Sequence, residues 1–167
     1  MHSKTLLLMR HAKSDHAEPG LKDHDRPLNP RGRRTAPLMA RLLHDQALTP
    51  DWIVSSTALR AHETAQLVAQ SLGFSSTTID RRRSLYLTTP REYVEVLRTL
   101  PDESSRVLVV GHNPTLEELI ARWRDEEEAI PTAAIALFEL PIDSWSDLQL
   151  DTPAQFRELW KPKELDY

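Results

Sequence analysis

The 167-residue sequence contains no cysteine and no apolar run long enough to cross a membrane. Without cysteine, disulfide bonds, thiol nucleophiles and thiolate metal sites are all excluded. The apolar run near the N-terminus covers only residues 5–9, and no small-residue cleavage site of a secretory signal follows it. We therefore expect a cytoplasmic protein without a membrane partner.

The chain also lacks a strong excess of charge of either sign. Its 21 basic and 25 acidic residues leave a formal net charge of −4, which does not favour binding to nucleic acid. Hydrophobic residues make up 40% and charged residues 28%, as is usual for a globular protein. No repeat, low-complexity tract or linker interrupts the chain. We therefore expect a monomer with one domain spanning residues 1–167.

Short apolar strands alternate with helical patterns, which predicts an α/β protein with helices on both faces of a mostly parallel sheet. The predicted strands cover residues 5–9, 51–55, 76–80, 107–110, 133–140 and 145–150. The predicted helices cover residues 30–44, 59–72, 90–100 and 114–124. The last two strands follow one another closely and are expected to pair antiparallel. The tail from residue 151 is expected to pack as a short helix or cap.

Single residues mark where helices should start and stop. Asn29 has the character of an N-cap, whereas Pro37 should either kink the helix that follows or delay its start. Thr89 and Glu92 have the spacing of a capping box. Residues 14–29 show no apolar period, and a loop of this length inside a compact domain is often functional.

Cationic and titratable side chains follow the three best strands. Arg10 and His11 end the first strand, Arg60 follows the second, and His112 follows the strand at residues 107–110. Ligands gather at the carboxyl ends of strands in open α/β sheets, so parallel neighbours would bring these side chains to one edge. Two of the strands also lead into helices, whose first N–H groups add positive partial charge there. The plainer reading is that Arg10 and His11 only mark the return of the chain to water.

Two arginines and two histidines at one sheet edge suit a dianionic phosphoryl group. Guanidinium groups can grip phosphate oxygens in pairs, and a neutral imidazole can attack phosphorus to form a phosphohistidine intermediate. The sequence contains neither a G-x-x-x-x-G-K-[ST] loop nor a G-x-S-x-G elbow. Of the two histidines we favour His11 as nucleophile, because it lies beside Arg10 at the end of an expected central strand. His112 would then donate to the transferring oxygens.

Four motifs, in order along the chain, resemble those of the histidine phosphatase (phosphoglycerate-mutase-like) superfamily. They read L-M-R-H-A-K, R-P-L-N-P-R-G, S-S-T-A-L-R-A-H-E-T-A and V-V-G-H-N-P. Within the superfamily the chain is similar to the small SixA-type phosphohistidine phosphatases. The resemblance implies a three-layer α/β/α sandwich whose mostly parallel sheet has an antiparallel member, and it implies no metal or other cofactor. It also implies His11 as the phosphorylated nucleophile, Arg26 as an additional pocket residue, and a phosphate pocket completed by Arg10, Arg60 and His112.

The motifs depart from the family pattern in ways that bear on catalysis. Ala12 stands where most members have glycine, which is tolerable if the backbone there is not left-handed. Many members also carry a general-acid glutamate, but the corresponding part of this chain reads R-R-S-L-Y, with Ser84 and no carboxylate. Acidic residues of the first loop could supply the proton instead, namely Asp15, Glu18, Asp23 or Asp25.

A missing proton donor favours substrates whose leaving group departs easily. General acid catalysis is typically worth ~10²–10⁴-fold, and its loss would affect sugar alkoxides more than imidazole. The modest chain length leaves little room for a lid, so the site should be open to a phosphate carried by a protein. We therefore expect hydrolysis of protein phosphohistidine, with a small phosphorylated molecule as the alternative substrate.

Two other functional classes remain open. One is an adaptor domain that binds phosphate without turnover, which only the missing glutamate supports. The other is a metal-dependent hydrolase that uses His11 and His112, although no H-E-x-x-H motif or matching carboxylate cluster is present. The other histidines are expected at the surface or in loops: His2, His16, His24, His44 and His62.

Overall fold

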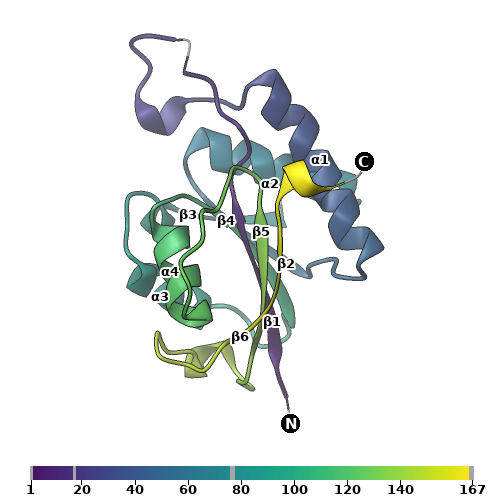
Figure 1. The fold of residues 1–167 in the computed structure, drawn as a ribbon, viewed down its shortest axis with the longest axis vertical. Coiled ribbons are helices and arrows are strands. Elements are labelled where there is room, and N and C mark those ends of the chain that lie inside the picture. The colour runs from purple at the N-terminus through teal and green to yellow at the C-terminus, as the bar shows by residue number, and fades with distance from the viewer. Residues whose placement is uncertain (1, 17, 76–77, 166–167) are drawn as a thin grey trace.

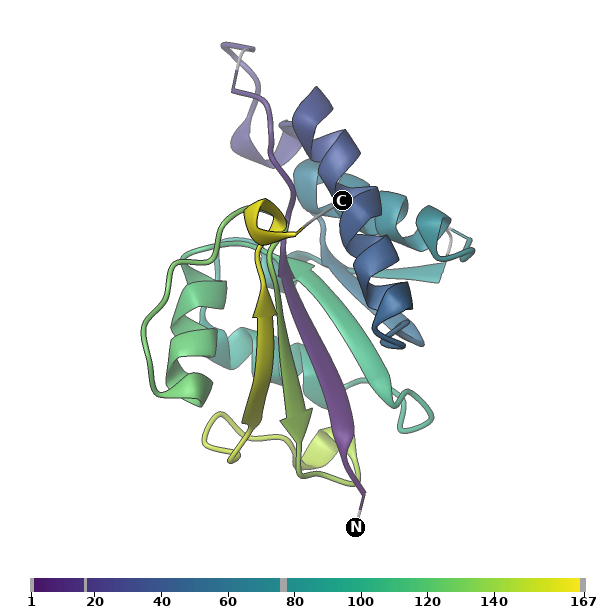
Figure 2. The same cartoon turned by 45° about the vertical axis from the view of Figure 1, so that its right-hand side comes forward.

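One six-stranded sheet runs through the computed structural model, which describes residues 2–16, 18–75 and 78–165 (Figure 1). The strands lie side by side in the order β3-β2-β4-β1-β5-β6. Their bounds are β1 Lys4–Arg10, β2 Trp52–Ser56, β3 Ile79–Arg82, β4 Arg106–Gly111, β5 Ile135–Leu140 and β6 Gln155–Trp160. Neighbouring strands from β3 to β1 are parallel, whereas β5 runs antiparallel to both β1 and β6 (Figure 2). The prediction of a mostly parallel sheet with an antiparallel member is confirmed.

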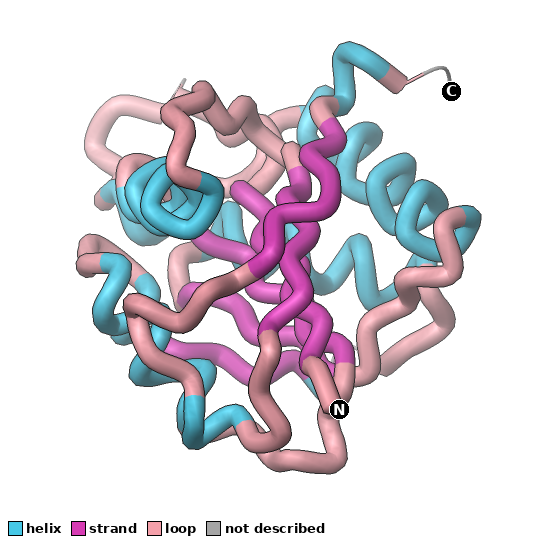
Figure 3. The backbone as a smooth tube through the Cα atoms, turned by 60° about the horizontal axis from the view of Figure 1, so that its bottom comes forward, coloured by secondary structure: helices cyan, strands magenta, loops and turns pink. Residues whose placement is uncertain are grey.

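Two pairs of helices cover the two faces of this sheet. Helices α1 (Pro30–Asp45) and α2 (Leu59–Ser71) pack on one face, and α3 (Pro90–Arg98) and α4 (Thr115–Arg124) pack on the other (Figure 3). The predicted three-layer α/β/α sandwich is therefore confirmed. Within the described ranges, no helix combines the length and apolar character that crossing a bilayer requires.

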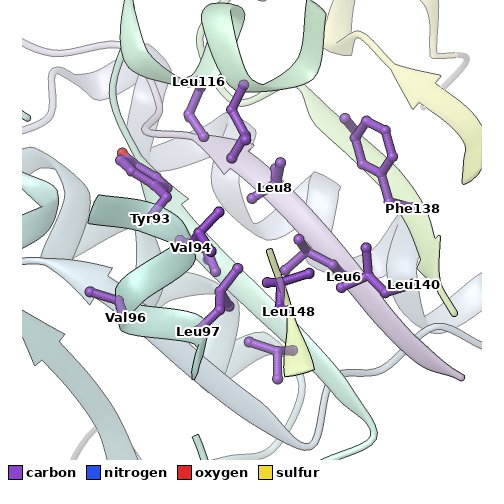
Figure 4. Packing of buried hydrophobic residues seen from close by; sticks show 14 of the residues in the cluster. Leu6, Leu8, Tyr93, Val94, Val96, Leu97, Leu116, Phe138, Leu140 and Leu148 are labelled. Atoms are coloured by element: carbon purple, nitrogen blue, oxygen red, sulfur yellow. The ribbon is translucent and has the colours of Figure 1, made fainter. Parts of the chain in front are cut away.

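The two cores beside the sheet follow from the alternation of side chains along β1. Leu6 and Leu8 join α3 and α4 in one buried cluster, whereas Leu7 and Met9 join α1 and α2 in the other. Successive side chains of a strand point to opposite faces, so a strand covered on both sides needs an unbroken apolar run. All four residues are fully buried. Figure 4 shows the first cluster around Leu6 and Leu8.

The residues expected at helix starts lie there, but two details differ from the predictions. The side chain of Asn29 accepts a hydrogen bond from the N–H of Gly32 at 2.9 Å and so caps α1. The helix then continues through Pro37, so the alternative that this proline delays its start is wrong. Packing of the apolar face of α1 outweighs the one hydrogen bond that proline cannot make. Thr89 precedes α3 as predicted, but its side chain makes no capping hydrogen bond, so the capping box is absent.

The C-terminal part of the chain differs most from the prediction. The antiparallel partner of β5 is β6, so the predicted strand at 145–150 is wrong. The tail beyond residue 151, expected as a short helix or cap, mainly forms β6, and only Pro162–Glu164 forms a short 3₁₀ helix. Residues Trp145–Asp147 instead form a 3₁₀ helix. Trp145 is fully buried there, and its indole N–H donates to the carbonyl of Ser104 at 2.7 Å. β6 lies at the edge of the sheet and mixes charged with apolar residues. Its pairing with β5 also contains a register shift. For both reasons the sequence of β6 lacks the regular apolar–polar alternation by which a strand is predicted.

The third strand lies later in the chain than predicted. β3 begins at Ile79, whereas the prediction covered residues 76–80, of which residues 76–77 lie outside the described residues. The guanidinium group of Arg82 pairs with the carboxylate of Asp80 at 2.7 Å within this edge strand. Such charged residues are typical of strand edges, but they give no apolar pattern by which the strand could be located.

Candidate active site

The predicted site residues lie at the carboxyl ends of three parallel strands. β1 and β4 pair in register with Arg10 beside Gly111, so His11 and His112 each come one residue after their strand. The main chain joins the two positions, because the N–H of His11 donates to the carbonyl of Gly111 at 3.0 Å. Arg60 lies in the first turn of α2, directly after β2, the other neighbour of β4. The sheet topology thus brings these side chains to one edge.

A cavity of about 220 Å³ at this edge contains the whole predicted set. It is lined by Arg10, His11, Arg26, Arg60 and His112. The remaining lining residues are Lys13, Ser14, His16, Asn113 and Thr132. The cavity wall therefore carries several cations and imidazoles and no carboxylate, which is the charge pattern that an oxyanion requires.

His11 is buried and held in one orientation by the main chain. Its Nδ1 lies 2.7 Å from the carbonyl oxygen of Ala12. The N–H of Ala12 in turn donates to the hydroxyl of Thr64 in α2 at 3.0 Å. Ala12 is not among the described residues with positive φ, so alanine in place of the family glycine carries no backbone strain.

Burial, together with the charges of Arg60, Arg10 and Arg26, lowers the pKa of His11 to about 3 against the opposing effect of the hydrogen bond to Ala12. The imidazole is therefore neutral at neutral pH. A neutral ring whose proton sits on Nδ1 has its lone pair on Nε2, which is the form that can act as a nucleophile.

The second histidine lies against the first. The rings of His11 and His112 are 5.2 Å apart between centroids, and Nε2 of His112 lies 2.8 Å from the hydroxyl oxygen of Ser56. That oxygen already accepts a hydrogen bond from the N–H of Ala58 at 3.2 Å. The Nδ1 atom of His112 is buried and has no hydrogen-bond partner among the described residues. Burial, His11 and Arg60 lower the pKa of His112 to about 3, so this ring is also neutral at neutral pH.

Two guanidinium groups are held beside the histidines with donors to spare. Arg10 donates to the carbonyl of Ile130 at 3.0 Å, and Arg60 donates to the carbonyl oxygen of Asp23 at 2.7 Å. The Nε atoms of both arginines are buried and unpaired within the described part of the chain. Burial lowers the pKa of Arg10, yet a guanidinium group stays protonated in proteins. Both side chains therefore keep charge and unused N–H groups for an anion.

Arg26 reaches the cavity from the long loop between β1 and α1. Its guanidinium group donates to the hydroxyl of Ser14 at 3.0 Å and to the carboxylate of Asp23 at 3.0 Å. A bridge between Ser14 and Leu28 closes the base of this loop. These contacts within the loop hold the guanidinium group of Arg26 at the cavity.

The sequence left Asp23 open as a proton donor, but in the structure this residue holds an arginine instead. Burial favours its neutral form, but hydrogen bonds from Tyr86, Arg26 and Arg60 outweigh burial and hold the pKa of this carboxyl well below its usual range. The carboxylate is therefore charged at neutral pH and has no proton to donate. It anchors Arg60, which donates to its Oδ2 at 3.0 Å.

Three neighbours of the cavity were not identified from the sequence. Tyr86 donates its hydroxyl to Asp23 at 2.6 Å, and its ring meets His112 edge-on at 5.6 Å. His24 meets the ring of Tyr86 at 4.8 Å, and His16 lines the cavity. His16 and Tyr86 come from irregular segments and His24 from the one-turn 3₁₀ helix Asp23–Asp25, so no periodic pattern indicates which way these side chains point. Their proximity to motif residues in the sequence is the only signal that could have pointed to them.

Other candidates considered from the sequence lie away from the cavity. Ser84, at the position expected for a general acid, is exposed in the 3₁₀ helix Arg83–Leu85. Glu18 and Asp25 are exposed and do not line the cavity. Among the described residues, no group of three or more histidine, aspartate or glutamate side chains is placed to hold a metal ion.

Comparisons with known proteins agree with this arrangement. The family description of the histidine phosphatase superfamily (branch 1) matches residues 6–85, the segment that contains Arg10, His11, Arg26 and Arg60. An uncharacterised protein of Mycobacterium tuberculosis is 33% identical over 152 residues, which cover 84% of this chain and 92% of that protein.

Two solved structures share the fold over nearly their whole length, and each is assigned as a phosphohistidine phosphatase SixA. The protein from Nakamurella multipartitia is 30% identical, with a TM-score of 0.81 over 97% of this chain and 98% of that chain. The protein from Agrobacterium tumefaciens is 28% identical, with a TM-score of 0.79 over 95% of this chain and 98% of that chain. The likeness thus extends past residue 85 to β4 and to His112, which follows it. The chain belongs to the histidine phosphatase superfamily (branch 1), in its SixA-type branch.

Proposed function

We propose that this protein removes the phosphoryl group from a phosphorylated histidine of another protein through a covalent intermediate on His11. The observation that carries the proposal is the 2.7 Å contact between Nδ1 of His11 and the carbonyl oxygen of Ala12. A carbonyl oxygen can only accept, so Nδ1 carries the ring proton and Nε2 carries the lone pair. This fixes the nucleophilic atom without a separate general base.

The surroundings of His11 support attack on a phosphoryl group. Arg10, Arg26 and Arg60 share the cavity with it and can balance a dianion. Ser56 accepts from the N–H of Ala58 and can donate its own proton to Nε2 of His112. With this direction of the hydrogen bond, which we propose, the ring proton of His112 lies on its unpaired Nδ1 and can be donated to a phosphate oxygen.

The proposed reaction runs in two displacements. In the first, Nε2 of His11 forms a bond to phosphorus and the P–N bond of the substrate breaks. The electron pair of that bond returns to the leaving imidazole, which departs as a neutral ring because its other nitrogen is already protonated in the substrate. In the second, water attacks phosphorus and the bond to Nε2 breaks. Inorganic phosphate and a proton are released, and His11 returns to its neutral form. Both steps build charge on the phosphate oxygens, where the cations and the donor of His112 act.

The lack of an acid in the cavity supports phosphohistidine as the substrate class. None of the lining residues is a carboxylate, and Asp23 is held in its charged form. An imidazole departs with less help than a sugar alkoxide, whose loss general acids accelerate by ~10²–10⁴-fold. The two SixA neighbours are named as phosphohistidine phosphatases, which agrees with this choice.

The proposal is tested by comparing leaving groups and by trapping the intermediate. We expect kcat/KM for a phosphohistidine peptide to exceed that for a sugar phosphate by roughly 10²-fold or more. Rapid quenching should yield a phosphoryl adduct on His11 that is acid-labile and base-stable. His11→Asn should abolish both turnover and adduct, whereas His44→Asn, an exposed position near the end of α1, should leave both unchanged.

Each other outcome identifies a different function. Equal or greater turnover of a sugar phosphate would favour a small-molecule phosphomonoesterase. Activity that a chelator removes would favour the metal-dependent reading. Phosphate binding without turnover would favour an adaptor domain.

A further inference from the structure

A second hollow of about 390 Å³ lies directly beside the phosphate cavity. Arg10, Lys13 and Thr132 line both hollows, so the two adjoin. We call the second one the basic groove. Its other side is formed by the first turns of α1 and by the 3₁₀ helix Pro162–Glu164 that follows β6. Figures 1 and 2 both show this C-terminal turn beside the end of β1 where the chain enters the site.

Charge in the basic groove is strongly one-sided. Five of its ten lining residues are basic, namely Arg10, Lys13, Arg31, Lys161 and Lys163, and only Glu164 is acidic. The chain as a whole has a net charge of −4, so this concentration of cations does not reflect the general composition. Like charges that share a hollow repel one another, and a bound anion would relieve this repulsion.

Three of these five cations have no side-chain partner among the residues that the structure describes. Lys161 pairs with Glu128 at 2.8 Å. Lys13, Arg31 and Lys163 are exposed, and none of them makes a side-chain hydrogen bond or ion pair with a described residue. The first turn of α1 packs closely against the chain at Lys13, so Arg31 and Lys13 are held on neighbouring walls of the groove.

The groove and the phosphate cavity differ in how they can bind an anion. The cavity presents hydrogen-bonded arginines that are buried (Arg60) or half-buried (Arg10 and Arg26) and suit one phosphoryl group in one position. The groove presents exposed side chains, two of them unpaired lysines on flexible stems. Such a surface attracts several carboxylates at variable positions and does not fix a single small ion.

We infer that the basic groove binds aspartate and glutamate side chains that flank the phosphorylated histidine of a protein substrate. This inference rests on the proposed function, because it assigns a specificity to the same site. Acidic flanks would be attracted before the phosphoryl group enters the cavity, which raises the rate of productive encounter.

Two phosphohistidine peptides with the same core test this inference, one flanked by Asp and Glu and the other by Asn and Gln. The wild-type protein should prefer the acidic peptide at low ionic strength, and about 0.5 M salt should remove the preference. Arg31→Ala/Lys163→Ala should lower kcat/KM for the acidic peptide by roughly 5- to 20-fold, as expected for the loss of two exposed charge contacts. It should not change turnover of phosphoramidate, which is too small to reach the groove.

The matched control is Arg34→Ala/Arg157→Ala, which removes the same charge from two exposed positions outside the groove. This variant should keep the preference of the wild-type protein. Lys163→Gln alone should show an intermediate loss, which provides the test if the double variant folds poorly. Circular dichroism identifies such a failure.

Three outcomes would overturn the inference. If the wild-type protein hydrolyses both peptides equally, the proposed function stands and the groove has no role in specificity. If Arg31→Ala/Lys163→Ala slows phosphoramidate as much as the acidic peptide, these residues belong to the phosphate cavity. If neither peptide nor phosphoramidate is hydrolysed, the proposed function fails and this inference fails with it.

Discussion

Two walls of the phosphate cavity are built in different ways. The sheet wall consists of His11, Arg60 and His112, each only 6–7% exposed and placed by parallel strands or by the helix that follows one. The loop wall comes from the segment between β1 and α1. Its Arg26 side chain is 18% exposed and pairs with Asp23, whose side chain is 50% exposed. The sheet wall thus fixes the position of Nε2 of His11, which we propose as the nucleophile, and the loop wall adds charge around it.

The two walls meet at one carboxylate. Asp23 accepts hydrogen bonds from Arg60 of the sheet wall and from Arg26 of the loop wall. A buried guanidinium group without a partner would be costly, so Arg60 needs this loop residue even though α2 places its backbone. The sheet therefore determines where Arg60 lies, and the loop determines which way its fork points.

The largest expected effect is on the pH dependence of stability, and it comes from the two histidines of the sheet wall. Since the pKa of His11 and that of His112 are both lowered to about 3, the folded protein binds fewer protons than the unfolded chain between about pH 3 and 6.5. The free energy of unfolding should therefore rise with pH across this window, by up to about 1.4 kcal/mol per pH unit for each histidine, and level off above it.

His11→Gln/His112→Gln should flatten this profile, and the single variants should lie between the two. Urea unfolding at several pH values from about 4.5 to 7 measures the slope, and this range excludes the titration of Asp23. A slope that the double variant does not reduce would show that the sheet wall does not hold its histidines in the neutral form.

Substituting one arginine in each wall compares their contributions to catalysis. Arg60→Lys keeps a charge but loses the fork that binds Asp23 and that we propose binds the phosphoryl group, so kcat/KM should fall by roughly 100-fold. Arg26→Lys changes a more exposed side chain at the rim and should cost less than roughly 10-fold. Steady-state kinetics with phosphoramidate measures both. Equal losses would mean that the loop wall holds the phosphate as firmly as the sheet wall.

Removing the charge of Asp23, the carboxylate that joins the walls, should lower activity less than Arg60→Lys does. Asp23→Asn keeps an acceptor but replaces charge-assisted hydrogen bonds with neutral ones, so kcat should fall about tenfold while KM changes little. Asp25→Asn in the same loop is the control, because its carboxylate contacts His24 and neither arginine of the site. If the two variants lose equal activity, Asp23 does not orient Arg60.

The difference between the sheet wall and the loop wall also explains how much of the site could be predicted from the sequence. His11, Arg60 and His112 follow strands with clear apolar runs, so parallel pairing alone brings them together. Asp23 begins a one-turn 3₁₀ helix and Tyr86 follows another, and in such short segments contacts between distant parts of the chain decide the direction of each side chain. For the same reason the sheet was predicted correctly at its centre and wrongly at its edges. There, β3 and β6 carry charged residues that break the alternation of a strand.

The smallest expected effect concerns the start of α1, where the loop wall ends. Asn29→Ala removes the capping hydrogen bond to Gly32 and should lower the free energy of unfolding by about 1 kcal/mol. Activity should change little, because the N–H of Asn29 still donates to the carbonyl of Lys13 and keeps the loop closed. Asn29→Ser, which can still cap, should restore most of the stability. If Asn29→Ala instead loses as much activity as Arg60→Lys, then the loop wall depends on the helix behind it, and it is as rigid a part of the site as the sheet wall.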